Sequence, residues 1–347
     1  MSQSGFREPT RTEFAPERDP RRWSNRSGQS RSQIASQSGV REPTRTESAL
    51  VHRISAWDGL PLLVREWRDG DTRPPLLCLP GIVRTSGDFA TLAEAVGAGR
   101  RVVSPDYAGR GGSGRTRDIT RYAPEACLRD VLDICAALHV HGAVAIGTSF
   151  GGLLSMGLAA ARPSLLRAVV LNDIGPDLGS TGTEFVRRFI GRDAVFADLD
   201  AAVAHLRAVL PPLSLEGDEA WRTMAALTYA PGSDGRLRPV WDTRIARLLN
   251  GPTPDLWALF GGLAHLPLLL VHGEVSDILL PATIERMRAA RPDLRLVGLP
   301  GIGHAPTLTE PPVLAALRSF LDDVDAPGPC VAQALGVAQA PGAPGAR

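Results

Sequence analysis

The sequence contains no lysine, and all 38 of its basic residues are arginine. Without an amine side chain, Schiff-base catalysis and a serine–lysine dyad are excluded. The 37 acidic residues bring the formal net charge to +1, so the chain lacks the basic excess typical of proteins that bind nucleic acid or anionic membranes. We therefore expect a small-molecule substrate, and neither nucleic acid nor a membrane as a partner.

Long apolar runs and metal-type cysteine motifs are also missing. No run reaches the roughly eighteen apolar residues of a membrane-spanning helix, and the N-terminal residues contain no hydrophobic segment of a secretory signal. Only Cys78, Cys127, Cys135 and Cys330 occur, and their spacing matches neither a zinc site nor a C-x-x-C redox pair. We expect buried thiols, no metal and a reducing, cytoplasmic compartment.

Composition divides the 347 residues into a folded region and two polar or low-complexity ends. Residues 1–48 are poor in apolar side chains and contain a direct repeat, because SQSGFREPTRTE at 2–13 returns as SQSGVREPTRTE at 36–47. These residues are predicted to be a disordered arm, and the Pro-, Gly- and Ala-rich residues 326–347 a disordered tail. The folded region is predicted to span residues 49–325.

Strands and helices alternate along the folded region. An alternating segment around an Asp-Gly turn at 51–67 predicts a hairpin, and apolar runs predict further strands at 74–81, 101–106, 142–149, 166–176, 266–273 and 294–301. Helical patterns lie between them at 88–99, 124–138, 150–163, 281–292 and 310–323. This order predicts an α/β fold, with a mostly parallel eight-stranded sheet and helices on both faces. Residues 177–264 are helix-rich and are predicted to form a cap between two core segments, 49–176 and 265–325.

A lone serine stands between two glycines in AIGTSFGG at 145–152. The glycines at 147 and 151 make the pattern G-x-S-x-G around Ser149, directly between a predicted strand and a predicted helix. Such a sharp turn pushes the serine oxygen outward, and the helix N-terminus adds positive potential. Although an inert serine in a glycine-rich turn gives the same pattern, we predict that Ser149 is a nucleophile.

A serine nucleophile needs a base, and the base needs a carboxylate that orients it. Of seven histidines, His304 lies in a glycine-flanked loop after the last predicted strand, and His272, at the end of another strand, is its nearest competitor. Asp277 follows the next-to-last strand and is predicted to be the acid. Asp173, after the preceding strand, is its stronger rival.

Two backbone amides are predicted to form an oxyanion hole. One belongs to Phe150, directly after the nucleophile, and the other to Ile82, in the loop after the strand at 74–81. Arg84, close by, either holds a substrate carboxylate or pairs with Asp88 four residues on. In the glycine-rich loop at 106–114, Asp106 is predicted to hold the loop by hydrogen bonds.

Three aromatic residues of the predicted cap are candidates for lining a substrate pocket. They are Trp221, Tyr229 and Trp241, and each has the alternative of ordinary packing.

Taken together, these motifs resemble the α/β-hydrolase superfamily, in the branch with a serine nucleophile and a helical cap. The matching pieces are LCLPGIVRTSGDF, VVSPDYAGRGGSGR, GTSFGGLLSMGLA, VVLNDIGP, HGEVSDILLP and GIGHAPTLTEP, in the family's order. The resemblance implies a triad of Ser149, Asp277 and His304, with Ile82 and Phe150 as oxyanion donors, and no cofactor or metal. Pro80-Gly81 replaces the His-Gly of many members. Serine at the turn disfavours the dehalogenases and epoxide hydrolases, which have aspartate there.

The predicted reaction is hydrolysis of a small carboxylic ester or lactone through an acyl-enzyme. The same triad serves C–C bond hydrolysis of a ring-cleavage-type diketone, and the fold also hosts non-catalytic small-molecule-binding proteins. A monomer or a homodimer is expected.

Overall fold

The computed structural model describes residues 49–250 and 255–326. Eight strands form one sheet in the order β1–β2–β4–β3–β5–β6–β9–β10, which confirms the predicted fold class. The strands are β1 (Leu50–Ser55), β2 (Pro61–Arg68), β3 (Leu76–Leu79), β4 (Arg101–Pro105), β5 (Ala143–Thr148), β6 (Leu166–Asn172), β9 (Leu268–Gly273) and β10 (Arg295–Leu299). The pairs β1–β2 and β2–β4 are antiparallel and the others are parallel. The predicted arm at 1–48 and the tail, apart from Ala326, lie outside the described residues.

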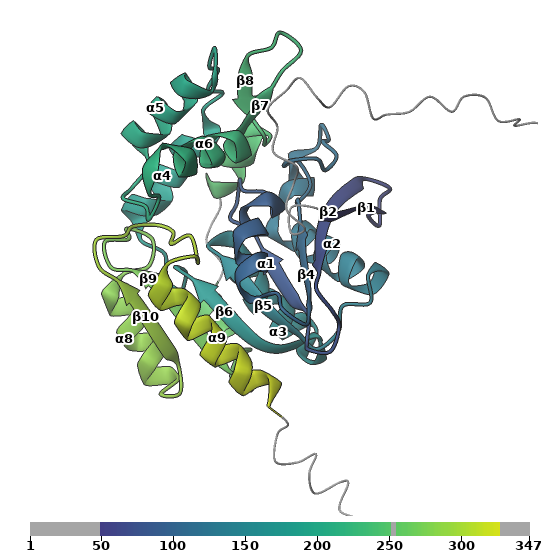
Figure 1. The fold of residues 1–347 in the computed structure, drawn as a ribbon, viewed down its shortest axis with the longest axis vertical. Helices are drawn as coiled ribbons and strands as arrows, with labels where there is room; N and C mark the ends of the chain where they lie inside the picture. Colours follow the sequence, from purple (N-terminus) through teal and green to yellow (C-terminus); the bar gives the residue numbers. More distant parts are fainter. Residues whose placement is uncertain (1–48, 251–254, 327–347) are drawn as a thin grey trace, which may run out of the picture. The chain divides into compact units, whose positions relative to one another are not determined.

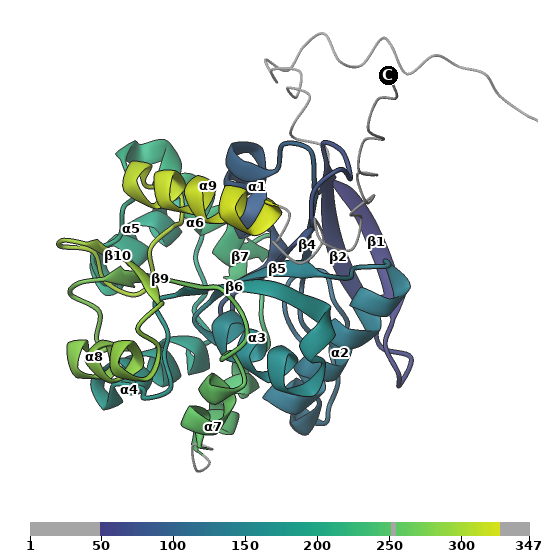
Figure 2. The ribbon, with the colours of Figure 1, turned by 90° about the horizontal axis from the view of Figure 1, so that it is seen from below.

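Two layers of helices enclose the sheet (Figure 2). One apolar core joins a sheet face to α1 (Ala90–Val96) and α9 (Pro311–Asp325). A second core joins the opposite face to α2 (Pro124–Ala137), α3 (Phe150–Ala161) and α8 (Pro281–Ala290). Because β3 and β5 are covered on both faces, their sequences are apolar almost without interruption.

Local sequence signals set the helix boundaries. Proline occupies the first helical position of α2, α8 and α9, where its missing N–H leaves no hydrogen bond unmade. The helix predicted at 88–99 is shorter and begins as a 3-10 turn at Ser86–Phe89 before α1. Among the described residues, none of the helices combines the length and apolar character needed to cross a bilayer.

The long segment between β6 and β9 contains most of the predicted cap. It comprises α4 (Ser180–Gly191), α5 (Leu199–Val209), α6 (Gly217–Thr228), the hairpin β7 (Tyr229–Pro231) and β8 (Leu237–Pro239), a 3-10 helix η4 (Thr243–Asn250), and α7 (Leu256–Gly261). The first three helices and the hairpin lie together in Figure 1. Their contacts reach the loops after β3, β4 and β9, which follow the carboxyl ends of these strands. The last helix differs, because the turn that follows α7 packs against the C-terminal part of α3.

Candidate active site

Ser149 lies at a strained turn between β5 and α3. Its φ of 52° and ψ of −115° place a non-glycine residue in a sparsely populated region. The turn is crowded, because a Cβ atom on Gly151 would overlap the carbonyl oxygen of Leu79, and one on Gly147 would overlap the carbonyl of Gly151. Gly152 leaves similar room for Ile174. The predicted strand–serine–helix turn is therefore present, and its glycines are required by backbone contact.

The side chain of His304 bridges Ser149 and a buried aspartate. Its Nε2 lies 2.8 Å from the Oγ of Ser149, and its Nδ1 lies 2.8 Å from an oxygen of Asp173. A carboxylate can only accept, so it selects the imidazole form with the proton on Nδ1. The lone pair of Nε2 is then available to accept the serine proton, which is the arrangement needed for base-assisted attack.

Several donors converge on Asp173, which is fully buried at the end of β6. Its other oxygen accepts from the amide of Gly273 and lies 3.0 Å from Nδ1 of His272. Burial alone would raise the pKa of this carboxyl, but hydrogen bonds from His272 and His304 outweigh burial and leave the pKa below its ordinary value. Asp173 is therefore ionised at neutral pH.

The prediction that Asp277 orients the base is corrected by this geometry. The Asp277 side chain is exposed. Its loop is fixed by two hydrogen bonds of Ile278, whose amide donates to the hydroxyl of Ser276 and whose carbonyl accepts from the amide of Gly179. The carboxylate beside His304 is instead that of Asp173, the rival from the sequence. The physical reason is distance from the strand end, because Asp173 directly follows the last residue of β6 and is held inside by the Gly273 amide, whereas Asp277 lies four residues past the end of β9 with its side chain exposed.

His272, the competing base, occupies a supporting position. Its imidazole binds Asp173, and within the described residues no hydrogen bond joins it to Ser149. His272 therefore helps to fix the aspartate, while His304 faces the hydroxyl.

A buried arginine contacts both residues whose amides are predicted to be oxyanion donors. Arg110 donates from Nε to the carbonyl of Ile82 at 2.7 Å, and its guanidinium lies over the ring of Phe150. Within residues 49–250 and 255–326, neither the Ile82 nor the Phe150 amide has an acceptor. Nothing in the sequence pattern singled out Arg110, which lies in the glycine-rich loop after β4.

The hydrogen bonds of Arg84 and Asp106 test two further predictions from the sequence. Arg84 makes a two-pronged ion pair with Asp88, at 2.6 and 2.7 Å, and also donates to Thr228, so the ion-pair alternative is confirmed. Asp106 accepts from the amides of Ser86 and Gly112, which confirms that it holds the glycine-rich loop.

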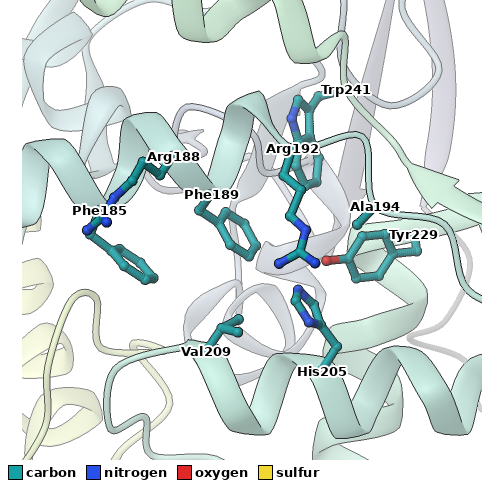
Figure 3. Close-up of a pocket in the computed structure, with 9 residues that line it drawn as sticks. All are labelled: Phe185, Arg188, Phe189, Arg192, Ala194, His205, Val209, Tyr229 and Trp241. Atoms are coloured by element: carbon teal, nitrogen blue, oxygen red, sulfur yellow. The ribbon is translucent and has the colours of Figure 1, made fainter.

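The segment predicted to be a cap contains a cavity of about 350 Å³ (Figure 3), called the cap cavity below. Its walls come from α4, the following loop, α5 and two aromatic residues: Phe185, Arg188, Phe189, Arg192, Ala194, His205, Val209, Tyr229 and Trp241. Tyr229 and Trp241 thus line a pocket as proposed from the sequence. Trp221 is absent from its lining and packs beneath Arg207. In the described part of the chain, no three acidic, histidine or cysteine side chains gather in a way that could hold a metal ion.

Comparison with known proteins settles the family. Residues 74–311 match the family model described as the alpha/beta hydrolase fold. The chain belongs to this family. It is 33% identical to a 3-hydroxybutyrate-oligomer hydrolase of Cupriavidus necator, over 74% of this chain and 90% of that protein. It is 28% identical to a 2-(acetamidomethylene)succinate hydrolase of Mesorhizobium japonicum, over 76% and 92%.

Solved structures agree with this assignment. An α/β hydrolase from Novosphingobium aromaticivorans superimposes with a TM-score of 0.74 at 39% identity, over 79% of this chain and 98% of that one. The family and its named hydrolase relatives identify this member of the α/β-hydrolase fold as an enzyme that hydrolyses its substrate.

Glycine substitutions test the crowding at the serine turn. Gly151→Ala is expected to lower the free energy of unfolding by about 2–3 kcal/mol, because the added methyl group meets rigid backbone. Gly157→Ala, on the same helix, is the matched control, since its Cβ would lie 3.4 Å from Leu128, an ordinary contact. That variant should gain about 0.5–1 kcal/mol from the lower entropy of the unfolded chain. Urea unfolding measures both, and equal stabilities would contradict the described packing.

Proposed function

We propose that this α/β hydrolase cleaves a carboxylic ester through an acyl-enzyme on Ser149. The observation that carries the proposal is the continuous hydrogen-bonded chain from the Ser149 hydroxyl through His304 to the ionised carboxylate of Asp173. A serine hydroxyl at neutral pH is a weak nucleophile, and this chain supplies both the base and the group that orients the base.

In the proposed mechanism, His304 takes the proton from Ser149 as the oxygen attacks the ester carbonyl carbon. The carbonyl electrons move onto oxygen, and the Ile82 and Phe150 amides stabilise the negative charge that develops there. When the tetrahedral intermediate collapses, the alkoxide leaves with the proton from the imidazolium, and an ester to Ser149 remains. Water then attacks that ester with His304 again as the base, releasing the acid and restoring the hydroxyl.

The choice of substrate is supported by the named relatives. The protein from Cupriavidus necator acts, by its name, on 3-hydroxybutyrate oligomers, which are linear oxoesters. We propose short linear esters of hydroxy acids as the substrate class. A diketone of the ring-cleavage type is the comparison substrate, and turnover of the diketone without turnover of any ester would favour the C–C hydrolase alternative.

A covalent label tests the nucleophile. A fluorophosphonate is expected to form one adduct per chain, mapped by mass spectrometry to Ser149, and hydrolysis of p-nitrophenyl butyrate should fall in proportion to labelling. Persistent turnover in fully labelled protein, or an adduct on a different residue, would contradict the proposal.

A further inference from the structure

The cap cavity described above contains the positively charged side chain of Arg192, for which the described residues supply no acceptor. Arg192 lies just past the end of α4, and in the described residues no hydrogen bond or ion pair to its guanidinium is found. Arg188, the other arginine of the lining, lies 3.5 Å from Glu184 on its own helix. Among the described residues that line the cavity, none has a carboxylate side chain.

Other donors face the same space. Figure 3 shows the Arg192 guanidinium beside the hydroxyl of Tyr229 and the ring of His205. Burial raises the pKa of Tyr229 to about 12, so this hydroxyl keeps its proton and can donate. Burial and the nearby Arg192 lower the pKa of His205, so its ring is neutral at neutral pH and adds no further charge. One cation and one hydroxyl donor thus converge where a single anionic group fits.

Hydrogen bonds and contacts link the cavity walls to both sides of the proposed catalytic centre. On one side, the wall residue Trp241 pairs by its backbone with Arg110, which holds Ile82 and covers Phe150. One wall of the cavity is therefore connected through Arg110 to the two residues whose amides are the proposed oxyanion donors.

On the other side, the wall residue Val209 ends α5, and Pro212 follows three residues later. The carbonyl of Pro212 accepts from the amide of Gly303 at 2.7 Å, and Gly303 directly precedes His304. Three residues of chain span at most about 11 Å, so Val209 lies within that distance of a residue that is hydrogen-bonded to the neighbour of the base.

From this arrangement we propose that the cap cavity binds a free carboxylate of the substrate through Arg192 and Tyr229. The inference rests on the proposed function and narrows it to linear esters that carry an acid group away from the scissile bond. A guanidinium matches a carboxylate in shape as well as charge, and such charge-assisted hydrogen bonds are the stronger ones. The aromatic side chains Phe185 and Phe189 cover the apolar part of such a chain.

Binding to an inactive variant tests the inference without any need for turnover. The probes are the linear 3-hydroxybutyrate trimer and the same trimer capped as its primary amide, titrated by calorimetry into Ser149→Ala protein. The free acid is expected to bind about 10-fold more tightly than the amide, and Arg192→Gln in the same background should abolish that preference. Raising the salt concentration from 0.1 to about 1 M should also weaken the preference, because the Debye length falls from roughly 10 to 3 Å.

The matched control is Arg187→Gln. Arg187 lies on α4, five residues before Arg192, pairs with Glu184 and does not line the cavity. Its substitution removes the same charge as Arg192→Gln and should keep the preference for the acid. Equal binding of acid and amide to the Ser149→Ala protein would overturn the inference, as would a preference that survives Arg192→Gln. Failure of the proposed function looks different, because it is the absence of Ser149-dependent ester hydrolysis in the wild type, whatever the binding preference.

Discussion

Ser149→Ala is expected to lower kcat for p-nitrophenyl butyrate by about 10⁴–10⁶-fold, the loss found when the nucleophile of a serine triad is removed. The reason is the 2.8 Å contact between its Oγ and His304, which leaves the base without a hydroxyl to activate once the oxygen is gone. Substrate binding should change little, because the amides and the cap cavity remain. Steady-state kinetics with the purified variant give both kcat and KM.

A second serine on the same helix is the matched control. Ser155 is buried and donates to the carbonyl of Gly151, yet it does not face His304, so Ser155→Ala should keep most of the activity. The double variant of Ser149 and His304 adds a sharper criterion. Because the two side chains act as one unit, the double variant should be about as slow as Ser149→Ala alone. Losses that multiply would contradict a joint role.

The sequence was sufficient to predict the eight strands of the main sheet and two of the three side chains of the proposed triad, but not the short hairpin β7–β8. Ser149 follows the buried, apolar strand β5, and His304 follows the edge strand β10, which is more exposed but has a similar apolar sequence; glycine flanks both residues. Both residues therefore lie at the same edge of the sheet, because the carboxyl ends of parallel strands meet there whatever the order of the strands. Their positions depend on local pattern alone.

The acid of the proposed triad could not be chosen from the local sequence pattern. Asp173 and Asp277 both follow a strand that ends at the active edge, and which of them reaches His304 is decided by tertiary contacts that bury the Asp173 carboxylate and leave Asp277 exposed. Asp173 also has a positive φ of 54°, and neither this backbone angle nor the contact of its carboxylate with His304 can be read from the neighbouring residues in the sequence.

The cap cavity was harder to foresee for the same reason. Its walls come from α4, α5 and the residues around the β7–β8 hairpin, and no motif links Arg192, His205 and Tyr229. Their proximity follows from helix packing, which fixes where side chains meet only after the elements are assembled. The aromatic candidates could be named from composition, whereas the arginine could not be distinguished from the other arginines of the cap.

When each of the two candidate acids is replaced by asparagine, the kcat values of the two variants are expected to differ by several orders of magnitude. Asp173→Asn should lower kcat about 10⁴-fold, because an amide in that position no longer selects the imidazole form with its proton on Nδ1 and cannot stabilise the imidazolium that forms during attack. Asp277→Asn is the matched control, since it makes the same change on an exposed side chain and should alter kcat less than about threefold. Kinetics of both variants with one ester at neutral pH make the comparison, and an inactive Asp277→Asn with an active Asp173→Asn would reverse the assignment.

The same substitution carries a signature in stability. The pKa of Asp173 is lower in the folded protein than in the unfolded chain, so its ionised form stabilises the fold at every pH above the unfolded value of about 3.8. That contribution to the free energy of unfolding is lost as the pH falls below about 3.8 and through the lower pKa that Asp173 has in the folded protein. Asp173→Asn should therefore be less stable than the wild type at pH 7, and the difference should shrink as the pH falls below about 4. Urea unfolding at pH 7 and pH 3 measures it, and a gap of equal size at both would mean that the carboxylate is not held by the two imidazoles.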